Sequence, residues 1–149
     1  AIIGKKTVST GMRTAGHYFF DYLHCKLSSI LHPRIKLIDT DDRRAVLSAY
    51  KQANLFLFGS RIECAPLVMY ESFASRTPFI TRLVGNVADH KEALKIVETP
   101  AEMARVANYI LDDPETGKAI TDRAYALWQK DHTWEKITGE YLELYKKAC

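Results

Sequence analysis

The chain alternates short apolar runs with longer segments in which apolar residues recur every three or four positions. The short runs predict strands, and the longer segments predict amphipathic helices. The predicted strands cover residues 1–4, 35–38, 55–58, 79–83 and 95–97. The predicted helices cover residues 17–31, 43–52, 66–75, 100–111, a segment that begins at Asp113-Pro114, and 134–147. Because strands and helices alternate, the sequence predicts an α/β fold in which helices cover both faces of a parallel sheet.

Acidic and hydroxyl residues mark the starts of several predicted helices. The acids of segment 39–42 can cap the helix 43–52. Thr99-Pro100-Ala101-Glu102 is a capping box with proline at the first helical position, and Asp113-Pro114 begins the next helix in a similar way. These local signals predict where the helices begin.

The segment after the third predicted strand carries the most informative chemistry. The run 55–58 is continuously apolar, which predicts a strand buried on both faces. Pro66 is expected at the first position of the following helix, where a missing N–H has no cost. The amides of Leu67 and Val68 then have no partner inside the helix and lie at the positive end of its dipole. They can therefore donate hydrogen bonds to a phosphate oxygen.

Two carboxylates flank this helix start. Glu71 lies four residues beyond Leu67, on the same helix face. Its two oxygens can accept hydrogen bonds from the paired hydroxyls of a ribose next to an amide-bound diphosphate. Glu63 precedes the helix and can meet a sugar on the far side of the phosphates. An isolated pair of glutamates at this spacing is usually a solvated surface feature, so the interpretation depends on the residues that accompany the pair.

Those residues resemble the Glu-x7-Glu motif of group 1, family-4-like glycosyltransferases, usually written Ser-x-x-Glu-Gly-Phe-x-Leu-Val-x-x-Glu-Ala. The matching residues are Ser60, Glu63, Pro66, Leu67, Val68, Glu71 and Ala74. Segments 74–81, 84–86 and 132–145 resemble the parts of the family that follow the motif. The similarity therefore covers most of the chain, and it implies a Rossmann-like parallel sheet, the C-terminal half of a GT-B fold.

The resemblance also implies roles for these residues. Glu71 would hold the nucleotide ribose, and Glu63 would contact the transferred sugar as the catalytic residue. The remaining expected substrate-binding residues are Cys64, Ala65, Leu67 and Val68. The implied function is transfer of a sugar from a nucleotide diphosphate sugar to a glycan or lipid-linked acceptor in glycan biosynthesis. The anomeric configuration would be retained, and neither a metal nor a cofactor would take part.

Some positions depart from the family pattern. Cys64 and Ala65 stand where Gly-Phe is usual, and a Cβ at Cys64 narrows the approach that glycine allows. Arg76 replaces a common glycine, and Asn86 replaces the second glycine of a turn. Of these, Cys64, Ala65 and Arg76 favour an alternative function, a non-catalytic binding or scaffolding domain that retains the fold and has lost the site.

Two other function classes receive less support. Asp39, Asp41 and Asp42 follow a predicted strand, as acids do in phospho-receiver domains, but the strand 55–58 ends at Gly59-Ser60 rather than at a further aspartate. No Gly-x-Gly-x-x-Gly or Gly-x-x-x-x-Gly-Lys-Ser/Thr loop follows any predicted strand, which argues against a dehydrogenase or a P-loop enzyme.

Composition and residue spacing argue against several kinds of binding site and protein class. The chain has 149 residues, 47% hydrophobic and 26% charged, which fits one globular domain or part of one. Its net charge of +3 and the absence of a basic run argue against nucleic-acid binding. The three cysteines and five histidines lack disulfide-framework or metal-ligand spacing. No apolar stretch of about 20 residues occurs, so we expect a cytoplasmic protein, or one at the inner face of the membrane.

The resemblance suggests that part of the fold is missing. In the related enzymes the donor domain begins with a strand, a loop with Arg and Lys for the diphosphate, and a helix, and none of these precedes Ala1. We therefore expect residues 1–149 to be a single, partial nucleotide-sugar-binding domain that is inactive alone. The acceptor-binding domain, with any peripheral membrane contact, would lie outside this chain.

Overall fold

The computed structural model describes residues 2–4, 27, 30 and 37–148. The chain divides into two compact units, Ala1–Ala49 and Tyr50–Cys149. The predicted helix 17–31 lies outside the described residues except for Leu27 and Ile30, which are both helical. Among the described residues, no helix is long and apolar enough to cross a membrane.

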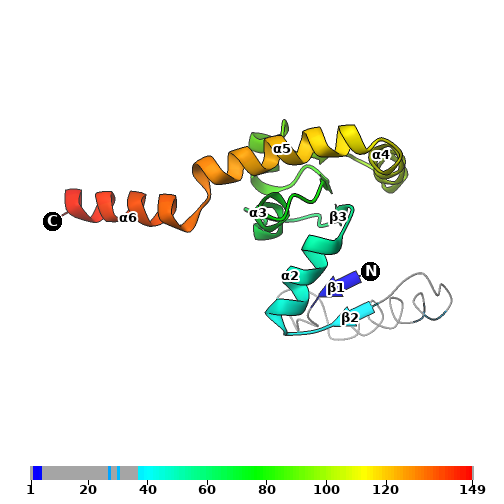
Figure 1. Ribbon diagram of the computed structural model, residues 1–149, viewed down its shortest axis with the longest axis horizontal. Coiled ribbons are helices and arrows are strands. Elements are labelled where there is room, and N and C mark those ends of the chain that lie inside the picture. Colours follow the sequence, from blue (N-terminus) through cyan, green and yellow to red (C-terminus); the bar gives the residue numbers. More distant parts are fainter. Residues whose placement is uncertain (1, 5–26, 28–29, 31–36, 149) are drawn as a thin grey trace. The chain divides into compact units, whose positions relative to one another are not determined.

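The first unit contains a parallel pair of strands, β1 (Ile2–Gly4) and β2 (Leu37–Asp39), which lie side by side in Figure 1. Helix α2 (Arg43–Gln52) begins in this unit and has the predicted bounds. The Asp42 carboxylate accepts a hydrogen bond of 2.9 Å from the Arg44 amide. This bond confirms that the acidic segment caps the helix.

The second unit contains a three-stranded parallel sheet in the order β3-β4-β5. The strands are β3 (Phe56–Phe58), β4 (Phe79–Thr81) and β5 (Lys95–Ile96), each within its predicted range. Phe56 lies opposite Phe79, and Ile80 lies opposite Lys95. The parallel arrangement confirms the prediction from the alternation of strands and helices.

Five helical segments belong to this second unit. They are α3 (Leu67–Ala74), a 3₁₀ helix η1 (Gly85–His90), α4 (Pro100–Asp112), α5 (Pro114–Asp131) and α6 (Trp134–Ala148). The Thr99 side chain caps α4 by accepting from the Glu102 amide at 3.1 Å, and Asp113 caps α5. The predicted Thr99 cap and the predicted helix start at Asp113-Pro114 are therefore confirmed, whereas η1 was not predicted.

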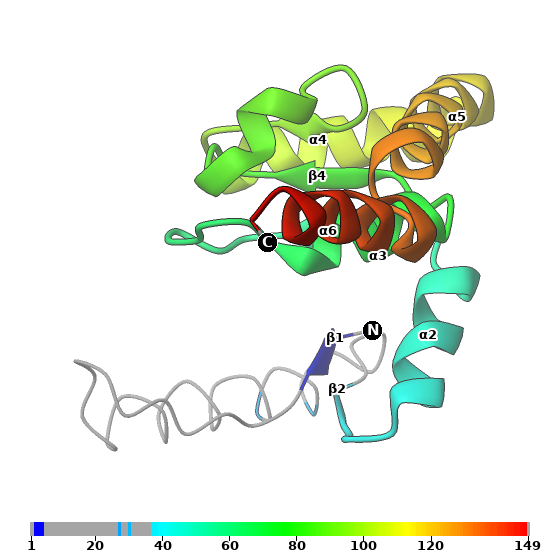
Figure 2. The ribbon, with the colours of Figure 1, turned by 90° about the vertical axis from the view of Figure 1, so that its left-hand side faces the viewer.

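Strand β4 lies at the centre of the core, because all three of its residues are fully buried. Successive side chains of a strand point to opposite faces. Accordingly, Phe79 packs in one apolar cluster with Met69 and Phe73 of α3, while Ile80 packs in another with Ala107 and Ile110 of α4. Figure 2 shows β4 between α3 and α4. Helices thus cover both faces of this sheet, as predicted.

The prediction that residues 55–58 are buried on both faces is wrong. Phe56 and Phe58 pack against the core, but the Leu57 side chain is 52% exposed. β3 is an edge strand of the three-stranded sheet, with β4 as its neighbour. Because side chains alternate along a strand, Leu57 points to the opposite face from the two phenylalanines. An apolar run alone does not distinguish a central strand from an edge strand.

Candidate functional site

Helix α3 begins one residue later than predicted. Pro66 has φ −70° and ψ 108°, an extended conformation that places it before the helix as its N-cap, so Leu67 is the first helical residue. Among the described residues, no side chain caps this end, and no acceptor takes the amides of Leu67 and Val68. Leu67 is 73% exposed, so its side chain does not pack over the amides at the helix start. Both amides are therefore available to an anion.

A short loop between β3 and α3 carries the first glutamate. The Ser60 hydroxyl donates a hydrogen bond of 2.8 Å to Oε1 of Glu63, whose side chain is half-buried. Cys64 and Ala65 follow and are exposed. The Ser-x-x-Glu spacing of the motif thus has a structural role, because the serine orients the carboxylate.

The start of η1 contacts the backbone of this loop. Gly85 has φ +52°, and a Cβ added there would lie 2.2 Å from the Cys64 carbonyl oxygen and 3.0 Å from that of Glu63. The next amide, that of Asn86, donates a hydrogen bond of 3.0 Å to the same Cys64 oxygen. Only glycine combines this left-handed conformation with so close a backbone approach. The glycine turn noted in the sequence is therefore part of the site.

The predicted site residues all lie around the start of α3. Glu71 is half-buried on this helix, four residues after Leu67, which places it about 6 Å further along the helix axis. Glu63, Cys64 and Ala65 lie in the loop before the helix, and Leu67 and Val68 form its first turn. The two amides and the two carboxylates thus all lie within one short segment of the chain, residues 63–71. Their individual roles stay predictions.

A polar cluster beside the site was not predicted. The Asn86 side-chain nitrogen donates to the Tyr70 hydroxyl at 2.9 Å, and this hydroxyl lies 3.0 Å from Nε2 of His90. The His132 ring packs on the Tyr70 ring, with 4.2 Å between the ring centroids. These residues come from α3, η1 and the end of α5, so no local spacing in the sequence could have indicated the cluster.

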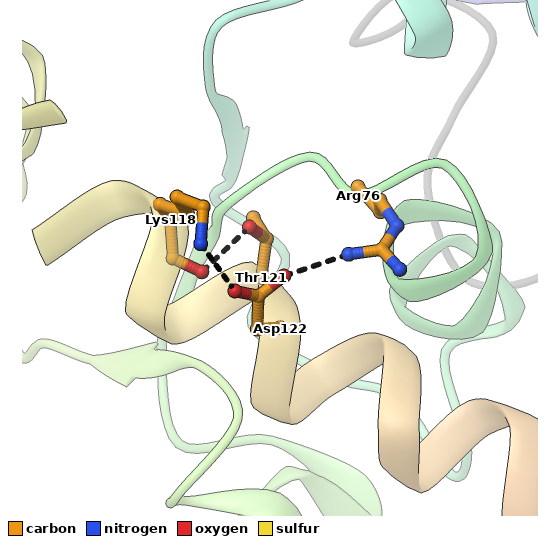
Figure 3. A network of polar contacts seen from close by, with 4 residues as sticks. All are labelled: Arg76, Lys118, Thr121 and Asp122. Atoms are coloured by element: carbon orange, nitrogen blue, oxygen red, sulfur yellow. Dashed lines mark hydrogen bonds and ion pairs between the residues drawn. The ribbon is translucent and has the colours of Figure 1, made fainter. Parts of the chain in front are cut away.

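Arg76 takes part in a different network, at the opposite end of α3 (Figure 3). Its φ of 56° lies in the left-handed region that favours glycine, which explains the common glycine here. The guanidinium lies 2.7 Å from Asp122 and over the ring of Tyr125, both on α5. A hydrogen bond from Lys118 lowers the pKa of the Asp122 carboxyl below its ordinary value, and the nearby Arg76 charge acts in the same direction. The arginine therefore joins α3 to α5 away from the candidate site.

Metal-binding side chains do not gather in the part of the chain that the structure describes. Within residues 2–4, 27, 30 and 37–148, no three His, Cys, Asp or Glu side chains are placed to hold an ion. The prediction that no metal takes part stays a prediction.

Comparison with known proteins identifies the family. The family model for glycosyl transferases group 1 matches residues 14–127, which is more than half of the chain and includes the whole candidate site. No curated protein sequence matches the chain significantly. The solved structure of sucrose-phosphate synthase from Thermosynechococcus elongatus is similar over 98% of this chain, with a TM-score of 0.78 and 22% identity.

That likeness is one of fold. The match covers 37% of the sucrose-phosphate synthase chain, so the present chain spans little more than a third of the length of that protein. The shared fold is the Rossmann-like fold of GT-B glycosyltransferases, as the resemblance implied. With the family match over most of its length, this chain belongs to the glycosyl transferases of group 1.

Proposed function

We propose that this chain is the donor-binding domain of a retaining glycosyltransferase and that it binds a nucleotide diphosphate sugar at the start of α3. The observation that carries the proposal is the uncapped helix start, where the amides of Leu67 and Val68 are available beside an exposed loop. Family membership supports a transferase reaction. The diphosphate would accept hydrogen bonds from these amides, with the ribose toward Glu71 and the transferred sugar toward Glu63.

In this arrangement the protein stabilises the departing diphosphate. Cleavage of the bond to the anomeric carbon places negative charge on the phosphate oxygens, and preorganised amide donors at a helix start stabilise it by about 3 kcal/mol each. Glu63, oriented by Ser60, would hold the sugar rather than attack it. The acceptor and the rest of the diphosphate site would belong to parts of the complete protein outside this chain.

Replacing Leu67 with proline tests the amide directly. Proline at the first helical position removes one N–H, and the extended conformation of Pro66 is compatible with a following proline. We expect donor affinity in the complete protein, measured by calorimetry with a panel of nucleotide sugars, to fall about tenfold, as for one lost hydrogen bond to a charged group.

The matched control is Leu67→Ala, which removes the exposed side chain and keeps the amide. We expect this variant to bind the donor like the wild type. Equal affinities of the proline and alanine variants would contradict the proposal, because they would show that the Leu67 amide makes no contact with the donor.

The alternative, a binding or scaffolding domain with a degenerate site, has one structural observation in its favour. Cys64 and Ala65, which replace the usual Gly-Phe, are both exposed in the loop beside the helix start, where they can obstruct a sugar. The other proposed sign of degeneracy, Arg76, lies at the far end of α3. Failure of the wild-type complete protein to bind any nucleotide sugar in the panel would favour the alternative.

Substitutions at position 76 distinguish an effect of Arg76 on the stability of the fold from an effect on donor binding. Arg76→Gly and Arg76→Ala both remove the contacts with Asp122 and Tyr125, but only glycine relieves the left-handed backbone. We expect the glycine variant to be more stable than the alanine variant by about 1 kcal/mol in urea unfolding. Donor affinity should be the same in both, and a gain of affinity in Arg76→Gly would show that Arg76 impairs the site.

A further inference from the structure

The polar cluster beside the site contains a continuous chain of hydrogen bonds. It runs from the Asn86 side-chain nitrogen to the Tyr70 hydroxyl at 2.9 Å, and from that hydroxyl to Nε2 of His90 at 3.0 Å. We refer to Tyr70, Asn86 and His90 as the Tyr70 relay. The aromatic ring of Tyr70 is also packed edge-on against Phe73 and the His90 ring, so its position is restricted.

The direction of these bonds follows from the groups involved. The side-chain nitrogen of Asn86 can only donate, so the Tyr70 oxygen accepts from it. The single hydroxyl hydrogen of Tyr70 can then be donated to Nε2 of His90 in the histidine tautomer that leaves this nitrogen unprotonated. In that tautomer His90 is neutral and carries its hydrogen on Nδ1, a buried atom that has no partner among the described residues.

The surroundings of His90 favour the same neutral form. Burial lowers the pKa of His90 below its ordinary value of 6.5, and a positive charge on His132 lowers it further, whereas Asp89 acts in the opposite direction. The groups that face His90 are thus Tyr70 on α3, Asp89 on η1 and His132 at the end of α5. In the tautomer with an unprotonated Nε2, a second ring proton would lie in a half-buried environment and would reverse the bond to Tyr70.

The relay is connected to the loop that carries Glu63. Asn86 is held through its side chain by Tyr70, and its backbone amide donates to the Cys64 carbonyl oxygen at 3.0 Å. Tyr70, the central residue of the relay, is the neighbour of Glu71 in α3. The two hydrogen bonds of Asn86, to Tyr70 and to Cys64, therefore fix the position of the Glu63–Cys64 backbone relative to α3, the helix that carries the second glutamate.

We propose that the Tyr70 relay positions the Glu63–Cys64 loop for the sugar donor, and that protonation of His90 disrupts this positioning and weakens donor binding. The inference rests on the proposed function, since it concerns the same site. The sign follows from linkage. If the donor is bound best by the form with neutral His90, affinity is constant above pH 6.5 and falls as the pH drops through the lower value that His90 has in the fold.

The test is a series of donor titrations of the complete protein between about pH 5 and pH 8. We expect wild-type affinity to fall about fivefold once His90 is protonated, below its lowered pKa, as for one lost hydrogen bond. Tyr70→Phe keeps the ring packing and removes the hydroxyl, so its affinity should be about fivefold lower at neutral pH and should change little with pH. Tyr109→Phe, which changes an exposed tyrosine on α4, is the matched control and should behave like the wild type.

A conservative variant distinguishes positioning from a general role in stability. Glutamine at position 90 can accept the Tyr70 hydrogen bond but cannot be protonated. His90→Gln should therefore bind the donor with wild-type affinity at neutral pH, and its affinity should not fall at acid pH. The ¹⁵N chemical shifts of the His90 ring give a readout without donor, and we expect the Nδ1–H tautomer at neutral pH.

The outcomes separate the two proposals. Wild-type protein that binds the donor with the same affinity at all pH values, or Tyr70→Phe that binds as tightly as the wild type, would overturn the inference and leave the proposed function in place. Wild-type protein that binds no nucleotide sugar at neutral pH would overturn both.

Discussion

Glu71→Ala is expected to cause a large loss of affinity for the nucleotide sugar in the complete protein. A carboxylate that accepts from both ribose hydroxyls makes two charge-assisted hydrogen bonds, and their loss would cost about 3 kcal/mol, on the order of 100-fold in affinity. Glu71 lies four residues after Leu67, so under the proposed function it would bind the same ligand as the helix amides. Calorimetric titration of the donor measures the effect.

Two further variants define what the Glu71 experiment means. Glu71→Gln retains one acceptor oxygen and should lose less affinity than the alanine variant. Glu115→Ala changes an exposed glutamate in the first turn of α5 and should bind the donor normally. If Glu71→Ala unfolds in urea like the wild type and also binds the donor with wild-type affinity, Glu71 does not bind the ribose.

Gly85→Ala is expected to destabilise the second unit and to displace the loop that carries Glu63. The new methyl group would lie 2.2 Å from the Cys64 carbonyl oxygen, a backbone atom that cannot rotate away, and the residue would have to keep a φ of +52°. The strained conformation and the overlap together should cost about 3 kcal/mol. Urea unfolding measures the loss of stability, and donor titration measures the accompanying loss of affinity.

Gly59→Ala is the matched control for this substitution. Gly59 begins the loop that carries Glu63, just after β3, and a Cβ there would meet nothing within 4 Å. Its free energy of unfolding should stay within about 0.5 kcal/mol of the wild type. If both alanine variants unfold at the same urea concentration, the backbone approach at Gly85 does not contribute to stability.

Much of the fold could be predicted from the sequence because its signals are local. The caps at Asp42, Thr99 and Asp113 lie next to the helices that they start, so they gave the helix starts correctly. Apolar runs likewise gave the strands of the three-stranded sheet. The exposed side chain of Leu57 was missed because exposure depends on which elements cover a strand, and a short apolar run does not encode its neighbours.

Part of the candidate site could likewise be predicted from local sequence, and part could not. Its glutamates and amides lie within the segment from Ser60 to Glu71, so a single motif could indicate them together. Tyr70 and His90 are 20 residues apart in the sequence, and His132 is still further away, so only the fold brings them together. Pro66 was placed one position too far into the helix, because the preference of proline for a helix start does not distinguish the N-cap from the first helical residue.

The uncapped start of α3 also has a practical consequence for assays. The amides of Leu67 and Val68, at the positive end of a helix that no side chain caps, can also bind small oxyanions such as inorganic phosphate and sulfate. Either salt at buffer concentration would compete with a nucleotide sugar and make its apparent dissociation constant larger. Zwitterionic buffers with chloride as the counter-ion avoid that competition and give the intrinsic affinity.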